Sequence, residues 1–189
     1  MYEVELKVEA NHARVRSALE DAGARPVDRL RQVDTYYDAP HRAFAETDEA
    51  LRIRRETEFD SESGEARETT TKMTYKGPLI EEASKTREEY ETAVADGDAA
   101  AGILDGLGFE PAATVEKERE RFRLDGYTVT LDSVAELGSF VEVEQEATEA
   151  DIERVREGAQ QLLRNLDLDP DEQIRTAYLG LLLGGNASK

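Results

Sequence analysis

The sequence predicts an α+β fold in which eight antiparallel β-strands close into a barrel with α-helices outside it. Three observations support this prediction. Short stretches in which apolar and charged side chains alternate recur along the chain, as expected for half-buried strands. Most of these stretches are joined by short turns, which antiparallel pairing allows. A set of eight antiparallel strands can close into a barrel, and closure removes exposed edges.

The first half of the chain begins with a clear strand. Val4, Leu6 and Val8 share one side of it, and the other side is charged. Asn11 is placed to cap a helix that Gly23 closes. Residues 57–68 are rich in turn formers and predict a long, mobile hairpin loop. The strands expected in this half are 1–10, 29–37, 51–56, 69–76 and 85–94, and the first helix is expected over 13–22.

The second half repeats the alternation and ends in helices. Asp125-Gly126 predicts a tight hairpin between two strands. Residues 1–183 are expected to form one domain, and residues 184–189 a disordered tail. The strands expected here are 114–124, 127–134 and 140–146, and the helices are 99–107, 151–166 and 170–183.

Composition narrows the classes of function. The 189 residues carry a formal net charge of -19, which argues against binding to nucleic acid or to a membrane surface. There is no cysteine, no basic-then-apolar leader and no apolar run of membrane-spanning length, so we expect a soluble cytoplasmic protein. Lysine is scarce, and an acidic surface with little lysine is typical of adaptation to high salt. Every lysine except Lys189 lies on the charged side of an expected strand.

The charged sides of the strands differ in sign. Strands at 52–54, 72–76, 85–87 and 117–123 offer cations, and strands at 3–5, 132 and 142–144 offer carboxylates. If the apolar sides face the helices, both kinds of charge face the interior of the barrel. Buried charges of both signs are costly in a dry interior, so we expect a wet lumen that meets a ligand. A polyanion with divalent cations would use both sets, because Arg and Lys bind phosphate and carboxylates bind Mg²⁺ or Mn²⁺.

Several motifs resemble one known family. Glu3-Val-Glu-Leu-Lys7 resembles the Glu-x-Glu-x-Lys opening of the CYTH superfamily, the triphosphate tunnel metalloenzymes. The resemblance covers residues 1–183 and is to the class IV adenylate cyclase branch; the barrel would then be a triphosphate tunnel. Its further segments are Asp34–Asp38, Ala50–Arg54, Tyr75–Pro78, Lys85–Glu89, Leu131–Val134 and Leu137–Glu144.

The resemblance implies roles for particular residues. Carboxylates at five positions would bind Mg²⁺ or Mn²⁺: Glu3, Glu5, Asp132, Glu142 and Glu144. Cations would bind the triphosphate: Lys7, Arg52, Arg54, Lys76, Lys85, Arg87, Lys117 and Arg119, with Lys72 and Arg121 as second-rank candidates on the same sides of their strands. Lys7, Lys76 and Arg119 are our candidates for a direct catalytic role.

Three functions are compatible with these residues. The first is a class IV adenylate cyclase that converts ATP to cyclic AMP and pyrophosphate. The second is a phosphohydrolase of inorganic, thiamine or nucleoside triphosphate. The third is a non-catalytic module that binds polyphosphate or nucleotide, against which the acidic set argues. The partner is expected to be a small molecule containing a triphosphate, and the resemblance leaves open whether the chain forms a homodimer through its final helix.

Overall fold

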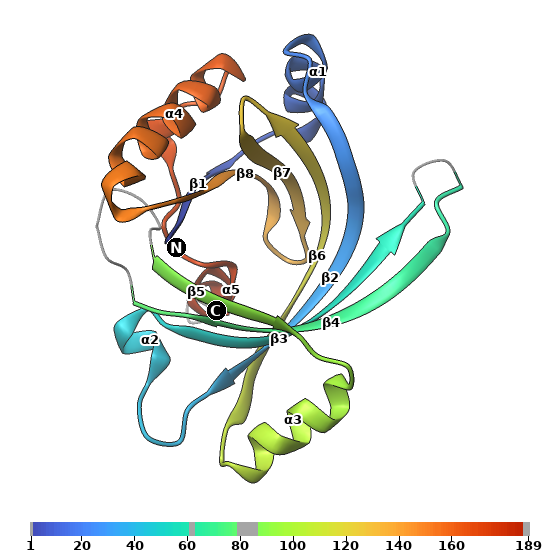
Figure 1. Cartoon of the computed structure of the whole chain (residues 1–189), viewed down its shortest axis with the longest axis vertical. Coiled ribbons are helices and arrows are strands. Elements are labelled where there is room, and N and C mark those ends of the chain that lie inside the picture. The colour runs from blue at the N-terminus through green and yellow to red at the C-terminus, as the bar shows by residue number, and fades with distance from the viewer. Residues whose placement is uncertain (1, 61–62, 79–86, 187–189) are drawn as a thin grey trace.

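The computed structural model describes residues 2–60, 63–78 and 87–186, apart from the side chains of residues 45, 185 and 186. Eight antiparallel strands form a closed barrel, as the sequence predicts (Figure 1). Their order around the barrel is β1-β5-β4-β3-β2-β6-β7-β8. The strands are β1 (Tyr2–Glu9), β2 (Arg25–Asp38), β3 (Ala50–Phe59), β4 (Ala66–Lys76), β5 (Arg87–Ala93), β6 (Glu110–Leu124), β7 (Tyr127–Val134) and β8 (Gly138–Ala147). The helices are α1 (His12–Asp21), α2 (Phe44–Thr47), α3 (Gly97–Gly106), α4 (Ile152–Asn165) and α5 (Tyr178–Asn186).

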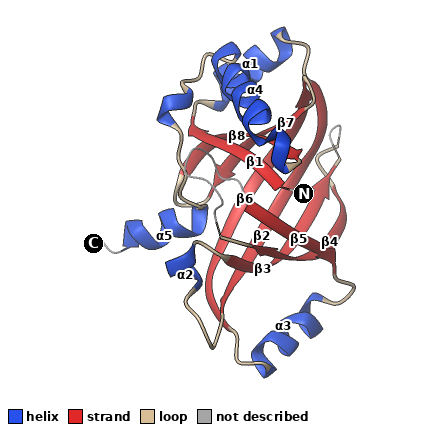
Figure 2. Ribbon diagram, turned by 60° about the vertical axis from the view of Figure 1, so that its left-hand side comes forward, coloured by secondary structure: helices blue, strands red, loops and turns tan. Residues whose placement is uncertain are grey.

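The apolar sides of the strands face outward, toward the helices. Val4, Leu6 and Val8 of β1 are buried in a cluster with residues of β7, β8, α1 and α4. A second cluster packs Ile53 of β3 against Leu104 of α3. Figure 2 shows α1 and α4 together at one end of the molecule and α3 at the other. Because these helices bury the apolar sides, the charged sides are left to line the interior.

The hairpin between β6 and β7 has the predicted tight turn. Leu124 pairs with Tyr127, and Asp125 and Gly126 between them have φ angles of 51° and 87°. Both angles lie in the left-handed region that this class of two-residue turn requires. Asp and Gly are well suited to that region, which is why the sequence signal was reliable here.

Two local expectations were wrong, and one short helix was missed. The strands flanking the expected 57–68 loop run on to Phe59 and resume at Ala66, because Thr57 and Thr69 pair across the hairpin with hydroxyl oxygens 2.9 Å apart. The helix expected over 170–183 is interrupted: a 3₁₀ turn at Pro170–Glu172 precedes α5, and between them the amide of Ile174 donates to the Lys7 carbonyl oxygen at 2.7 Å. The short helix α2 was not anticipated.

The end of the chain is partly described. Helix α5 continues to Asn186, inside the stretch expected to be a disordered tail, and residues 187–189 lie outside the described residues. Within the described ranges, no helix is long and apolar enough to cross a membrane.

A glycine allows α4 to approach β7 closely, and its replacement should destabilise the fold. A Cβ on Gly158 would overlap the Tyr127 hydroxyl oxygen and lie 3.0 Å from Cζ. That hydroxyl donates to the Val155 carbonyl oxygen at 2.9 Å. Gly158→Ala is therefore expected to lower the free energy of unfolding by about 2 kcal/mol in chemical denaturation. Gly102→Ala in α3 is the matched control, because no atom lies within 4 Å of its added Cβ; equal stabilities of the two variants would contradict the packing argument.

Candidate active site

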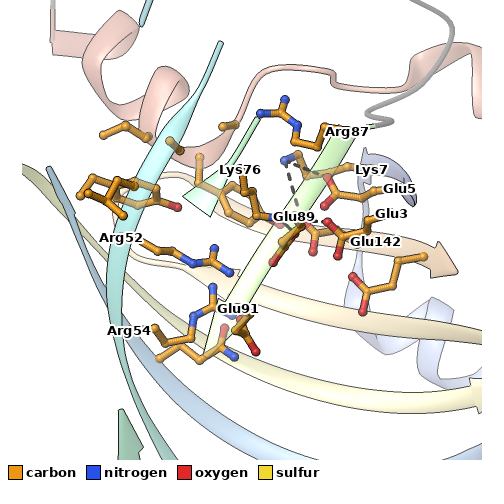
Figure 3. A pocket seen from close by; sticks show the side chains of 18 of the residues that line it. Glu3, Glu5, Lys7, Arg52, Arg54, Lys76, Arg87, Glu89, Glu91 and Glu142 are labelled. Carbon is orange, nitrogen blue, oxygen red and sulfur yellow. Dashed lines mark hydrogen bonds and ion pairs between the residues drawn. The ribbon is translucent and has the colours of Figure 1, made fainter. Parts of the chain in front are cut away.

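The barrel encloses a cavity of about 1050 Å³ that is lined by the charged sides of the strands. Figure 3 shows carboxylates and cations from β1, β3, β4, β5 and β8 converging on it. The prediction that these charged sides face inward is therefore confirmed. The predicted site residues that line the cavity are Glu3, Glu5, Lys7, Arg52, Arg54, Lys72, Lys76, Arg87, Lys117, Arg119, Arg121, Glu142 and Glu144.

Three carboxylates form a compact acidic group. Glu5 of β1 is opposite Glu144 of β8 in the strand register, and Glu142 lies two residues before Glu144 on the same side. One carboxylate oxygen from each of the three lies within 4.8 Å of the others. Burial and the nearby carboxylates of Glu3, Glu142 and Glu5 raise the pKa of Glu144 to about 7. A hard divalent cation such as Mg²⁺ or Mn²⁺ would fit this oxygen donor set and offset its repulsion.

Glu3, predicted to bind metal, has a cationic partner in this structure. Its carboxylate lies 2.9 Å from Lys76 Nζ, which is also 2.6 Å from Glu89 of β5. Burial lowers the pKa of Lys76, but the two carboxylates outweigh burial and raise the pKa above its ordinary value. Lys76 therefore stays charged between Glu3 and Glu89. Glu89 was not among the predicted site residues, although it shares a strand side with Arg87.

Asp132, also predicted to bind metal, is fully buried and does not line the cavity. Its two oxygens accept from Arg119 at 2.6 and 2.5 Å, and one oxygen also accepts from Lys117 at 3.3 Å and from the Tyr178 hydroxyl at 3.0 Å. Glu142 accepts a further short hydrogen bond from Arg119. Asp132 thus orients the cations of β6, and it stands apart from the acidic group of Glu5, Glu142 and Glu144.

Asp34 of β2 plays the same part for the cations of β3. It accepts from Arg54 at 2.6 and 2.7 Å and lies 3.5 Å from Arg52.

Two cations of the cavity have unusual surroundings. Burial lowers the pKa of Lys117 to about 8, and the nearby guanidinium of Arg119 acts in the same direction. Within the described parts of the chain, the buried Nε of Arg52 has no hydrogen-bond acceptor. Such a donor is suited to a phosphate oxygen.

The ion pairs of Asp34 predict an acid dependence of stability. Burial raises the pKa of Asp34, but Arg54 and Arg52 lower it further, so the net shift is downward. A carboxylate whose pKa is depressed by folding contributes stability above its unfolded pKa of about 3.9, and the contribution is lost as the pH falls below that value. The difference in unfolding free energy between the wild type and Asp34→Asn is therefore expected to be largest near pH 6 and to shrink toward pH 3. Chemical denaturation across this range measures it, and a difference that grows in acid would contradict the assignment.

Two further predicted cations of the cavity, Lys72 and Arg121, are each paired with carboxylates. Lys72 lies 3.5 Å from both Glu56 and Glu91. Arg121 donates to Asp28 through Nε at 2.7 Å. These are the two second-rank candidates of the sequence prediction, and here their charges are balanced by carboxylates from neighbouring strands.

A known protein family matches most of this chain. The family model described as the CYTH domain matches residues 1–178. The chain belongs to the CYTH family. CYTH proteins are in general metal-dependent and bind triphosphate substrates, which suits a cavity that holds a carboxylate group beside an array of cations.

Related CYTH proteins cover nearly the whole chain. A Methanocaldococcus jannaschii protein named "Putative adenylate cyclase" is 34% identical over 183 residues, 96% of this chain and 98% of that protein. The structure of the PH1819 protein from Pyrococcus horikoshii is 36% identical, with a TM-score of 0.86, over 97% of this chain and 99% of that one. The structure of a Hippeastrum protein, described as a putative adenylyl cyclase with a dominant triphosphatase activity, shares the fold (16% identity, TM-score 0.67, 97% and 95% coverage).

Arg87, another predicted cation of the CYTH site, lies beside the end of α2. Arg87 donates to the Asp48 carboxylate at 2.7 Å and to the Asp48 carbonyl oxygen at 2.6 Å. Asp48 ends α2 with a φ of 53°, so the turn after this helix holds the guanidinium. Lys85 lies outside the described residues. Arg87 is thus placed by a helix that sequence periodicity did not reveal.

Proposed function

We propose that this CYTH protein is a divalent-metal-dependent enzyme acting on a triphosphate, and that its reaction is that of a class IV adenylate cyclase, ATP to cyclic AMP and pyrophosphate. One observation carries the proposal. The carboxylates of Glu5, Glu142 and Glu144 face the same cavity as the cations of β1, β3, β4 and β6. A polyanion alone would be repelled by the carboxylates, whereas a triphosphate accompanied by Mg²⁺ or Mn²⁺ would use both sets.

In this proposal the chain's own residues bind and orient the triphosphate. The guanidinium groups of Arg52, Arg54 and Arg119 and the ammonium groups of Lys7, Lys76 and Lys117 would contact its oxygens. In the cyclase reaction the ribose 3′-oxygen forms a bond to the α-phosphorus, the bond from that phosphorus to the bridging oxygen breaks, and the 3′-hydroxyl proton is released. The cations stabilise the charge that grows on pyrophosphate as it leaves. A bound divalent ion would add Lewis-acid stabilisation of phosphoryl oxygens.

Two observations favour the cyclase reaction. The 34% identical relative from M. jannaschii is named as a putative adenylate cyclase. The residues that line the cavity also include the aromatic or aliphatic side chains of Tyr36, Phe44, Leu179 and Leu183. Such side chains in a cavity with cations would accommodate the organic part of a nucleotide, which inorganic triphosphate lacks.

A triphosphatase is the second candidate, and the Hippeastrum neighbour is the reason to keep it. That protein is described as having a dominant triphosphatase activity. In this reaction water would attack the γ-phosphorus, the bond from that phosphorus to the bridging oxygen would break, and orthophosphate would be released. The same charged cavity would serve, with the substrate in a different register.

One assay separates the candidates. The protein is incubated with ATP, and separately with tripolyphosphate, in Mg²⁺ or Mn²⁺ at high salt, and the products are separated by ion-exchange chromatography. Cyclic AMP and pyrophosphate in equal amounts are expected from ATP. Release of orthophosphate from either substrate without cyclic AMP would show that the protein is a triphosphatase and not a cyclase. Binding of both substrates without turnover would leave a non-catalytic binding module.

A further inference from the structure

The first residue of α5 reaches the charged cavity. Tyr178 is buried, and the segment from Thr176 to Gly180 lines the cavity wall. Its ring packs against Phe140 of β8 with centroids 5.1 Å apart. The amide of Ile174, just before the helix, donates to the Lys7 carbonyl oxygen at 2.7 Å. The end of the chain is therefore attached to β1 and β8 at the level of the site residues.

The Tyr178 ring is close to two of the proposed phosphate-binding lysines. Lys7 Nζ lies 4.0 Å from the ring centroid and Lys117 Nζ lies 5.0 Å from it. Both distances are within the range of a cation–π interaction. The two lysines come from β1 and β6, which are not neighbours in the barrel. One ring thus contacts cations from two separate parts of the wall.

The Tyr178 hydroxyl acts on a third cation through a carboxylate. It donates to Asp132 Oδ2 at 3.0 Å, and Asp132 in turn accepts two of the three hydrogen bonds that fix the Arg119 guanidinium, the third going to Glu142. Burial and the carboxylates of Glu142 and Asp132 raise the pKa of Tyr178, so the hydroxyl remains a donor at ordinary pH. Within the described residues, no other side chain donates to Asp132 besides these cations and Tyr178.

We propose that Tyr178 is a positioning residue for triphosphate: its ring holds the Lys7 and Lys117 ammonium groups, and its hydroxyl holds Asp132 and thereby Arg119. Docking of α5 then sets the arrangement of three cations that lie on different strands. The inference rests on the proposed function, since it assigns these cations to triphosphate. It adds a role for a residue that need not touch the substrate.

The first test is the affinity for tripolyphosphate in the presence of Mg²⁺, measured by isothermal titration calorimetry, together with the melting temperature. Tyr178→Leu removes the ring contact and is expected to weaken binding about 30-fold. Tyr178→Phe keeps the ring, so its affinity for tripolyphosphate is expected to lie within about threefold of the wild type. The kcat for ATP is expected to fall about tenfold with little change in KM, because Arg119 is less well oriented without the hydroxyl. Tyr127→Phe is the control, because it also removes a buried tyrosine hydroxyl bond but lies away from the cavity.

The second test reads the ring contact in the wild-type protein. The chain has six lysines, so lysine-selective labelling gives a short NMR spectrum. The side-chain methylene signals of Lys7 and Lys117, assigned with Lys7→Arg and Lys117→Arg, are expected to be shifted upfield by the Tyr178 ring. Wild-type protein without these shifts, or Tyr178→Leu that binds tripolyphosphate as tightly as Tyr178→Phe, would overturn the inference. Wild-type protein that shows the shifts but does not bind tripolyphosphate would instead overturn the proposed function, and with it the role of Tyr178 in binding.

Discussion

Glu5→Gln is expected to lower turnover of ATP by about two to three orders of magnitude without unfolding the protein. Glu5 supplies one of the three carboxylates whose oxygens lie within 4.8 Å of one another. Its amide replacement keeps the shape of the side chain and removes the negative charge that a divalent cation needs. We therefore also expect Mn²⁺ to bind more weakly to the variant in isothermal titration calorimetry, which separates a metal-binding defect from any other cause of low turnover.

Glu9→Gln is the matched control on the same strand. Glu9 is exposed at the end of β1 and is not among the residues that line the cavity. This variant is expected to keep the wild-type rate and the wild-type affinity for Mn²⁺. If Glu5→Gln behaved like Glu9→Gln in both measurements, Glu5 would be removed from the proposed metal site.

Arg54→Lys is expected to lower kcat/KM by about two orders of magnitude while preserving the positive charge. Arg54 is held by two hydrogen bonds to the buried Asp34, which fix the plane of the guanidinium. Lysine offers a point charge and cannot reproduce this two-point contact. The charge on Asp34 remains paired, so the variant is expected to fold, and the loss should appear in steady-state kinetics with ATP.

The neighbouring residue on β3 provides the control. Arg55 points to the opposite side of the strand, where it forms an exposed ion pair with Asp98 of α3. Arg55→Lys carries the same chemical change one residue away and is expected to leave kcat/KM unchanged. Equal effects of the two substitutions would mean that Arg54 acts through general electrostatics and has no geometric role.

Much of the barrel could be predicted because strand alternation is a local property. Each strand shows which side is apolar within a few residues, as Val4, Leu6 and Val8 do. The tight turn at Asp125-Gly126 is equally local, since two residues supply the required φ angles. Elements without a periodic pattern were missed, such as α2 and the break between the 3₁₀ turn and α5, because tertiary contacts decide them.

The sequence by itself determined which side of each strand is charged and which charges that side brings. Only the tertiary structure decided how those charges are grouped. Glu3 pairs with Lys76, and Asp132 is buried beneath Arg119, so the compact acidic group is Glu5, Glu142 and Glu144. The physical reason is that alternation reports the side of a strand, whereas the partner of a charge depends on the register of neighbouring strands. Which strands lie side by side joins residues far apart in the chain, and the alternation within one strand does not show which strand is its neighbour.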